Sequence, residues 1–152
     1  RTLIEAPYLN EFLEQNPGVL INKVELTLPI DPLSSINSFA DGPPPNIALH
    51  EATDNNLISR DESGGLNYIV NQGDEIGANK DSKYYIYSET NKNYQVDLSL
   101  YVQKYALNPT SDFKIIISAY GEGISVERAV LFDTQKSSEK TKLKFYYTNR
   151  GE

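Results

Sequence analysis

The feature that most constrains this chain is a two-residue alternation of apolar and polar side chains. It is clearest in 22–30 (NKVELTLPI), whose apolar positions alternate with polar ones: Val24, Leu26, Leu28 and Ile30. Successive side chains of a β-strand point to opposite faces of a sheet, so this pattern predicts a strand with one buried face. Similar patterns predict further strands over 2–7, 46–52, 83–89, 93–99, 112–120, 125–133 and 140–148.

The alternation also assigns the residues that face the core. In 46–52 (NIALHEA) these are Ile47 and Leu49, which follow three consecutive prolines. Prolines lack an N–H donor and favour an extended backbone, so they are expected to stiffen the approach to this strand. The later strands contribute Phe113, Ile115, Ile117 and Ala119, and then Leu143, Phe145 and Tyr147.

Two short helices are expected among the strands. In 6–18 (APYLNEFLEQNPG), Leu9, Phe12 and Leu13 have helical spacing, between Pro7 near the start and Gly18 after the end. In 96–107 (VDLSLYVQKYAL) the apolar stripe is Leu98, Tyr101, Val102 and Tyr105. Asp97 or Ser99 is expected to cap this helix by accepting hydrogen bonds from its unpaired N–H groups.

Many short alternating strands separated by polar turns indicate an all-β protein. We expect a β-sandwich of jelly-roll type with two short helices, in which the inner faces of two sheets share one core. The 152 residues suffice for a single domain, 1–152. Two loops, 32–39 and the polar stretch 53–82, interrupt the pattern, and 66–70 (LNYIV) is the only strand-like part of the second.

Composition excludes several classes of function. The net charge is −7, whereas proteins that bind nucleic acid usually show a basic patch, so no nucleic-acid partner is expected. There is no cysteine, which excludes a disulfide, a thiolate nucleophile and a cysteine-based zinc site. No apolar run has the length of a membrane span. The chain begins at Arg1 and contains no methionine, so we expect a mature or excised piece of a longer protein.

His50 is the only histidine and therefore the first candidate for catalysis or metal binding. It alternates away from Ile47 and Leu49, and Glu51 would point to the opposite face from it. Catalysis requires a partner that positions the imidazole, and the sequence supplies none nearby. We therefore expect His50 to be a residue of the sheet surface, with no catalytic and no metal-binding residue in the chain.

Carboxylates are frequent in 53–82: Asp54, Asp61, Glu62, Asp74, Glu75 and Asp81. A hydrolase that acts on sugars needs two carboxyl groups across a cleft, and no spacing here defines such a pair. Calcium prefers several oxygen ligands, so a loop-bound Ca²⁺ is an alternative, although the EF-hand spacing is absent. No other cofactor is expected.

Tyrosines are the remaining candidates for ligand binding. Four of them, from two strand segments, are the candidates for an aromatic surface: Tyr84, Tyr85, Tyr87 and Tyr146. Exposed aromatic rings can stack on sugars or anchor a protein partner. Tyrosine also suits strands for structural reasons, because its ring packs while its hydroxyl stays hydrated. The absence of tryptophan weakens the sugar interpretation.

The order of several motifs resembles the C-terminal region of the DUF4270 family of Bacteroidota cell-envelope lipoproteins. The motifs follow one another along nearly the whole chain: INKVELTLPID, PPPNIALHEA, YQVDLSLYVQKYA, FKIIISAYG, ERAVLFD and KTKLKFYYT. The resemblance implies a secreted protein at the outer membrane or cell surface, held by a lipid anchor upstream of this chain. It implies no catalytic residues.

The sequence therefore favours a non-catalytic binding domain, an accessory subunit of a cell-envelope protein assembly. A carbohydrate-binding module of the cell surface is the alternative. A hydrolase that uses loop carboxylates is the third class.

Overall fold

The protein is described here from a computed structural model that covers residues 1–31, 43–70, 84–107, 113–119 and 140–149. The predicted strand 125–133 and the loop 32–39 lie outside these residues. The elements in chain order are β1 (Thr2–Glu5), α1 (Tyr8–Gln15), β2 (Val19–Pro29), β3 (Asn46–Glu51), β4 (Tyr85–Ser88), β5 (Asn93–Asp97), α2 (Ser99–Leu107), β6 (Lys114–Ala119) and β7 (Lys142–Asn149).

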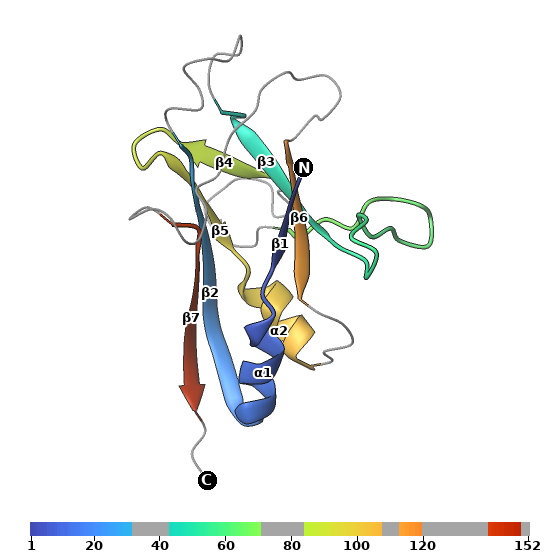
Figure 1. Ribbon diagram of the computed structural model, residues 1–152, viewed down its shortest axis with the longest axis vertical. Helices are drawn as coiled ribbons and strands as arrows, with labels where there is room; N and C mark the ends of the chain where they lie inside the picture. The colour runs from blue at the N-terminus through green and yellow to red at the C-terminus, as the bar shows by residue number, and fades with distance from the viewer. Residues whose placement is uncertain (32–42, 71–83, 108–112, 120–139, 150–152) are drawn as a thin grey trace, which may run out of the picture.

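The seven described strands form one antiparallel sheet in the order β1-β6-β3-β4-β5-β2-β7. β4 joins the two halves because it pairs with β3 on one side and with β5 on the other. The sheet is curled, and its two helices lie together beyond one end of β5 (Figure 1). The all-β class and the two helices are confirmed. The two separate sheets of a sandwich, jelly-roll-like or otherwise, are not.

Both halves of the sheet contribute to one hydrophobic core. Val24, Leu26 and Leu28 of β2 are at most 1% exposed, and so are Leu49 of β3 and Ile115 of β6. The alternation in β2 therefore identified its buried face, and Ile47 and Leu49 are confirmed as core residues. Curling brings the two halves of the described sheet around a shared interior.

The prolines before β3 are attached to the sheet through their carbonyl groups. The Tyr94 hydroxyl donates to the Pro44 carbonyl, and the Tyr87 N–H donates to the Pro45 carbonyl at 2.9 Å. Proline cannot donate a backbone hydrogen bond, but its carbonyl still accepts. The proline run therefore leads into β3 as an anchored, extended segment.

α2 begins where the sequence predicts. The Asp97 carboxylate accepts a hydrogen bond from the Ser99 N–H at 2.8 Å, which is the predicted capping interaction. The Ser99 hydroxyl in turn accepts from the Val24 N–H at 2.9 Å, and this bond ties the helix to β2. Val102 of α2 and Leu98, which directly precedes the helix, are both buried, so these two residues of the predicted apolar stripe face the core.

The segment 53–70 folds back so that 67–69 runs antiparallel beside the end of β3. The Ile69 N–H donates to the Leu49 carbonyl at 2.8 Å, and the Glu51 N–H donates to the Asn67 carbonyl at 3.1 Å. The strand-like 66–70 makes isolated bridges, such as Tyr68 with His50, instead of a continuous strand. Four successive residues of β3, Ile47 to His50, are buried, so both faces of this strand are covered.

Candidate functional site

One hollow among the described residues is an apolar groove beside α1. Its volume is about 440 Å³, within the range of roughly 300–1,000 Å³ that is usual for ligand sites. We call it the edge groove, because it extends from the end of β1 to β7, and these are the two outermost of the described strands. Its lining residues are Glu5, Ala6, Pro7, Tyr8, Leu9, Phe12 and Phe145.

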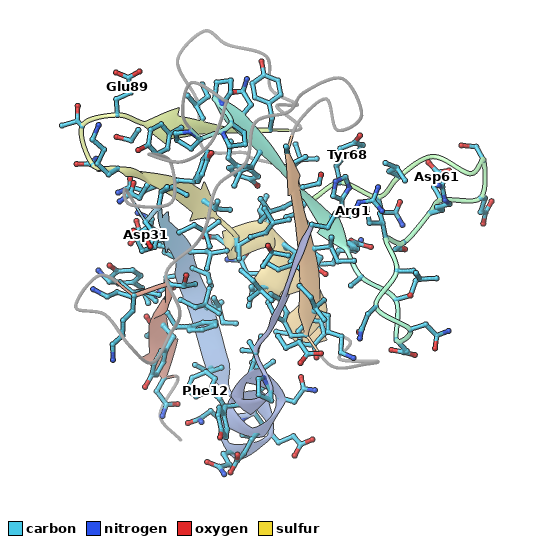
Figure 2. All side chains as sticks on the ribbon, turned by 45° about the horizontal axis from the view of Figure 1, so that its top comes forward. Arg1, Phe12, Asp31, Asp61, Tyr68 and Glu89 are labelled. Atoms are coloured by element: carbon cyan, nitrogen blue, oxygen red, sulfur yellow. The ribbon has the colours of Figure 1, made fainter. Side chains whose placement is uncertain are left out.

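The position of α1 explains the groove. Pro7 precedes the first helical residue, where its fixed φ and missing N–H are tolerated. Leu9 is then buried, and Phe12 packs on β7, with ring centroids 6.3 Å from Phe145 and 5.2 Å from Tyr147. Figure 2 shows Phe12 on α1, at the end of the molecule away from Glu89. The helix therefore forms one wall of the groove and β7 contributes the other.

Tyr8 gives the edge groove an exposed aromatic rim. Its side chain is 79% exposed although the neighbouring Leu9 is buried. Glu5 also lines the groove, and its carboxylate lies 3.6 Å from the Lys114 ammonium. An apolar wall with an exposed aromatic ring and one carboxylate is suited to an apolar side chain of a partner.

The predicted tyrosines do not form one surface. Tyr85 is 1% exposed, and its hydroxyl donates to the Ile69 carbonyl at 3.1 Å, so the prediction of a surface residue is wrong for Tyr85. Tyr84 is half-buried, and half-buried Tyr87 packs on Tyr94 at 5.3 Å between centroids. Burial raises the pKa of the Tyr85 phenol well above its ordinary value, and that of Tyr87 in the same direction.

Tyr146 is the candidate that remains well exposed, at 47%. It lies on β7, and its hydroxyl donates to the Glu25 carboxylate at 3.0 Å. Lys23 is 2.7 Å from the other oxygen of the same carboxylate. The hydrogen bond from Lys23, and to a smaller extent that from Tyr146, holds the pKa of Glu25 below its ordinary value. The ring is thus fixed by polar neighbours on the outer face of β2 and β7.

His50 lies on the sheet face opposite to Leu49, as the alternation predicts, but it is buried, so the prediction of a surface residue is wrong. It is 2% exposed and packs on the ring of its bridged neighbour Tyr68, at 4.7 Å between centroids. Its Nε2 atom is 2.9 Å from the Ser118 hydroxyl, which is also buried. A histidine and a serine at this distance are components of a nucleophilic site, but here both are buried, which favours a structural hydrogen bond.

The carboxylates of 53–70 are engaged locally. The Asp61 carboxylate accepts from the Ser63 hydroxyl at 2.7 Å and from the Gly65 N–H at 2.8 Å. Gly64 has φ +84°, a conformation that favours glycine, and a Cβ on Gly65 would lie 2.7 Å from an Asp61 oxygen, so the carboxylate would have to shift. Figure 2 shows Asp61 on the part of the segment that projects from the sheet.

Among the described residues, no group of three His, Asp or Glu side chains could hold a metal ion. Asp54 and Glu62 are exposed. The other candidates, Asp74, Glu75 and Asp81, lie outside the described residues.

The Asp61 turn predicts a local dependence on pH. Hydrogen bonds from Ser63 and Gly65 lower the pKa of Asp61 below its ordinary value of 3.8. The ionised carboxylate therefore favours the turn above the unfolded pKa, and this contribution is lost as the pH falls through the lower folded pKa. We expect the Ser63 and Gly65 amide resonances to shift in an NMR titration with a midpoint below 3.8.

Asp61→Asn is the control for this titration, because it should abolish the shift of both amides. A midpoint at or above 3.8 in the unmodified protein would contradict the prediction.

Comparison of the chain with protein-family models, with curated proteins and with solved structures finds no match. In the described part of the chain, no helix is long and apolar enough to cross a membrane.

Sequence reasoning identified the residues of the edge groove only as structural ones. It placed Leu9 and Phe12 on a helix and Phe145 on a strand, but it did not bring them together. A signal was present in Tyr8, a large aromatic residue outside the apolar stripe of its helix.

Proposed function

We propose that this chain is a non-catalytic binding domain that holds an apolar segment of a partner protein in the edge groove. The observation that supports this function best is the groove itself, an apolar hollow of about 440 Å³ with Tyr8 exposed at its rim. Protein interfaces concentrate their binding energy in a few aromatic anchors that pack in such pockets.

The arrangement of the other candidates favours binding over catalysis. His50 and Ser118 are buried in the sheet, and Asp61 is engaged by its own turn. These groups contribute to the structure, which leaves the groove as the described feature best suited to a partner.

The setting that we propose is a secreted lipoprotein of the outer membrane or cell surface, an accessory subunit of a cell-envelope protein assembly. Its support is the ordered series of motifs that resembles the DUF4270 lipoproteins. The lipid anchor would lie upstream of this chain.

The carbohydrate-binding alternative has weaker support. Stacking on a sugar ring needs exposed aromatic side chains. Tyr85 lies in the core, and Tyr87 packs against Tyr94. Tyr146 alone is a small platform, and its hydroxyl is bound to Glu25.

Site-specific photo-crosslinking in cells that produce the full-length protein tests the groove. With p-benzoylphenylalanine in place of Tyr8, we expect one discrete crosslinked species, because a partner segment in the groove passes this exposed position. Mass spectrometry of the adduct identifies the partner residues. Ala6→Leu in the same background should reduce the adduct severalfold, since the larger side chain narrows the groove.

The matched control places the same probe at Ile86, an apolar residue of β4 that is 69% exposed and does not line the groove. Equal labelling from Ile86 and Tyr8, or an adduct insensitive to Ala6→Leu, would argue against the groove as the binding site.

A further inference from the structure

The exposed ring at the rim of the edge groove is bordered by acidic side chains. Glu5, at the end of β1, lines the groove, and its side chain is 50% exposed. Glu11 follows Tyr8 by three positions on α1 and is exposed. Residues three apart are neighbours on the surface of a helix. Tyr8 therefore has one carboxylate in the strand that leads into its helix and another in the helix itself.

Lysines on the neighbouring strands leave the Glu5 carboxylate available to a further cation. The Lys114 ammonium lies 3.6 Å from it and donates to the Asn56 side-chain carbonyl at 3.3 Å. The side chain of Lys114 is only 15% exposed, so at this pair the carboxylate is the more accessible charge. Lys144 precedes Phe145 in β7, and successive side chains of a strand point to opposite faces, so Lys144 is directed away from the groove.

The combination of an aromatic ring and carboxylates favours arginine as the bound cation. The ring of Tyr8 is 79% exposed, so its faces are accessible to a partner. A guanidinium is planar and stacks on such a face, while its N–H groups remain directed outward to carboxylates. A lysine ammonium is a point charge and does not match both features in the same way.

The charge of the whole chain acts in the same direction. The net charge is −7, so the protein attracts cationic segments and repels acidic ones during encounter. A second copy of the chain carries the same net charge and is therefore disfavoured as the occupant.

We propose that the segment bound in the edge groove is basic as well as apolar, with an arginine beside its apolar side chain. The apolar side chain contacts Phe12 and Phe145 in the hollow, while the guanidinium stacks on Tyr8 and pairs with Glu5. This inference rests on the proposed function and names the chemistry of the partner segment.

The test uses three acetylated, fluorescently labelled peptides of equal length, titrated against the whole chain by fluorescence anisotropy at physiological salt. The first alternates arginine and leucine, the second has glutamate in place of arginine, and the third has serine in place of leucine. The arginine–leucine peptide should bind about tenfold more tightly than the glutamate–leucine peptide, because opposite charges attract and like charges repel. The arginine–serine peptide should bind weakly, because it lacks the apolar anchor.

Variants of the protein locate the preference. Glu5→Gln should lower the affinity for the arginine–leucine peptide about threefold, the scale of an exposed ion pair. Tyr8→Leu keeps an apolar side chain but removes the aromatic face, and it should cost about threefold as well. The matched control is Glu62→Gln, which makes the same charge change at an exposed residue that does not line the groove. Circular dichroism and thermal melting check that each variant is folded.

The outcomes separate this inference from the proposed function. Equal binding of the arginine–leucine and glutamate–leucine peptides would overturn the arginine preference. The groove would still be the binding site if Ala6→Leu weakened both peptides. Equal effects of Glu5→Gln and Glu62→Gln would trace the preference to net charge alone and would also overturn the inference. So would tight binding of the arginine–serine peptide, or no binding of the arginine–leucine peptide at millimolar concentration. Crosslinking from the Tyr8 position decides the groove independently.

Discussion

Replacement of Phe113 by alanine should lower the free energy of unfolding by about 3–5 kcal/mol, the usual cost of removing a buried aromatic ring. Phe113 is 2% exposed and directly precedes β6. Its ring lies 5.6 Å from that of Tyr101 and 5.3 Å from that of Tyr105, both on α2. The substitution would leave a cavity where α2 packs on the sheet. Urea unfolding followed by circular dichroism measures the change.

Leu107→Ala is the control for this prediction. Leu107 lies at the end of α2 and is 88% exposed, so its truncation should change the free energy of unfolding by no more than about 0.5 kcal/mol. A loss below about 1 kcal/mol for Phe113→Ala would contradict the packing described for this ring.

His50→Ala should destabilise the protein by about 2–4 kcal/mol, through a cavity and a lost buried hydrogen bond. Both His50 and its partner Ser118 are buried, so truncation leaves the serine hydroxyl without the imidazole 2.9 Å away. It also removes the ring that packs on Tyr68. Thermal and urea unfolding of the variant measure the loss.

A double-mutant cycle isolates the hydrogen bond from the packing. His50→Phe keeps an aromatic ring, Ser118→Ala removes the hydroxyl, and the double variant removes both polar groups. Each single change removes the hydrogen bond but keeps one of its two polar groups buried, so the double variant should be more stable than the sum of the single losses by about 0.5–1.5 kcal/mol. Additive losses would show that the two side chains do not interact energetically.

The alternation of apolar and polar residues correctly predicted strands that have one buried face and one exposed face. β2 has one buried face, so its apolar residues at every second position were identified directly. His50 was misjudged because β3 is covered on both faces. The residue that covers it, Tyr68, lies beyond an irregular loop, and no two-residue pattern indicates where such a loop returns.

Tyr85 shows a second limit of pattern reading. In β4 the residues alternate tyrosine and isoleucine, both of which suit a buried face. Pairing with Ile47 on β3 places Tyr85 inward and leaves Ile86 69% exposed. The register across strands decides the orientation, and register is not contained in the local sequence. The edge groove was unpredictable for a similar reason, since Phe12 and Phe145 come from opposite ends of the chain.

The strand order also has a consequence for the time at which this protein can fold. β2, near the beginning of the chain, is flanked by β5 and β7, and β1 pairs with β6. Sheets dominated by contacts between distant residues fold slowly, because long loops must close before those contacts form. During synthesis, β2 could pair only after β5, and then β7, has been made. Until β7 emerges from the ribosome, the apolar face of the N-terminal third remains incompletely covered, and a growing chain with such a face depends on rapid completion or on chaperones.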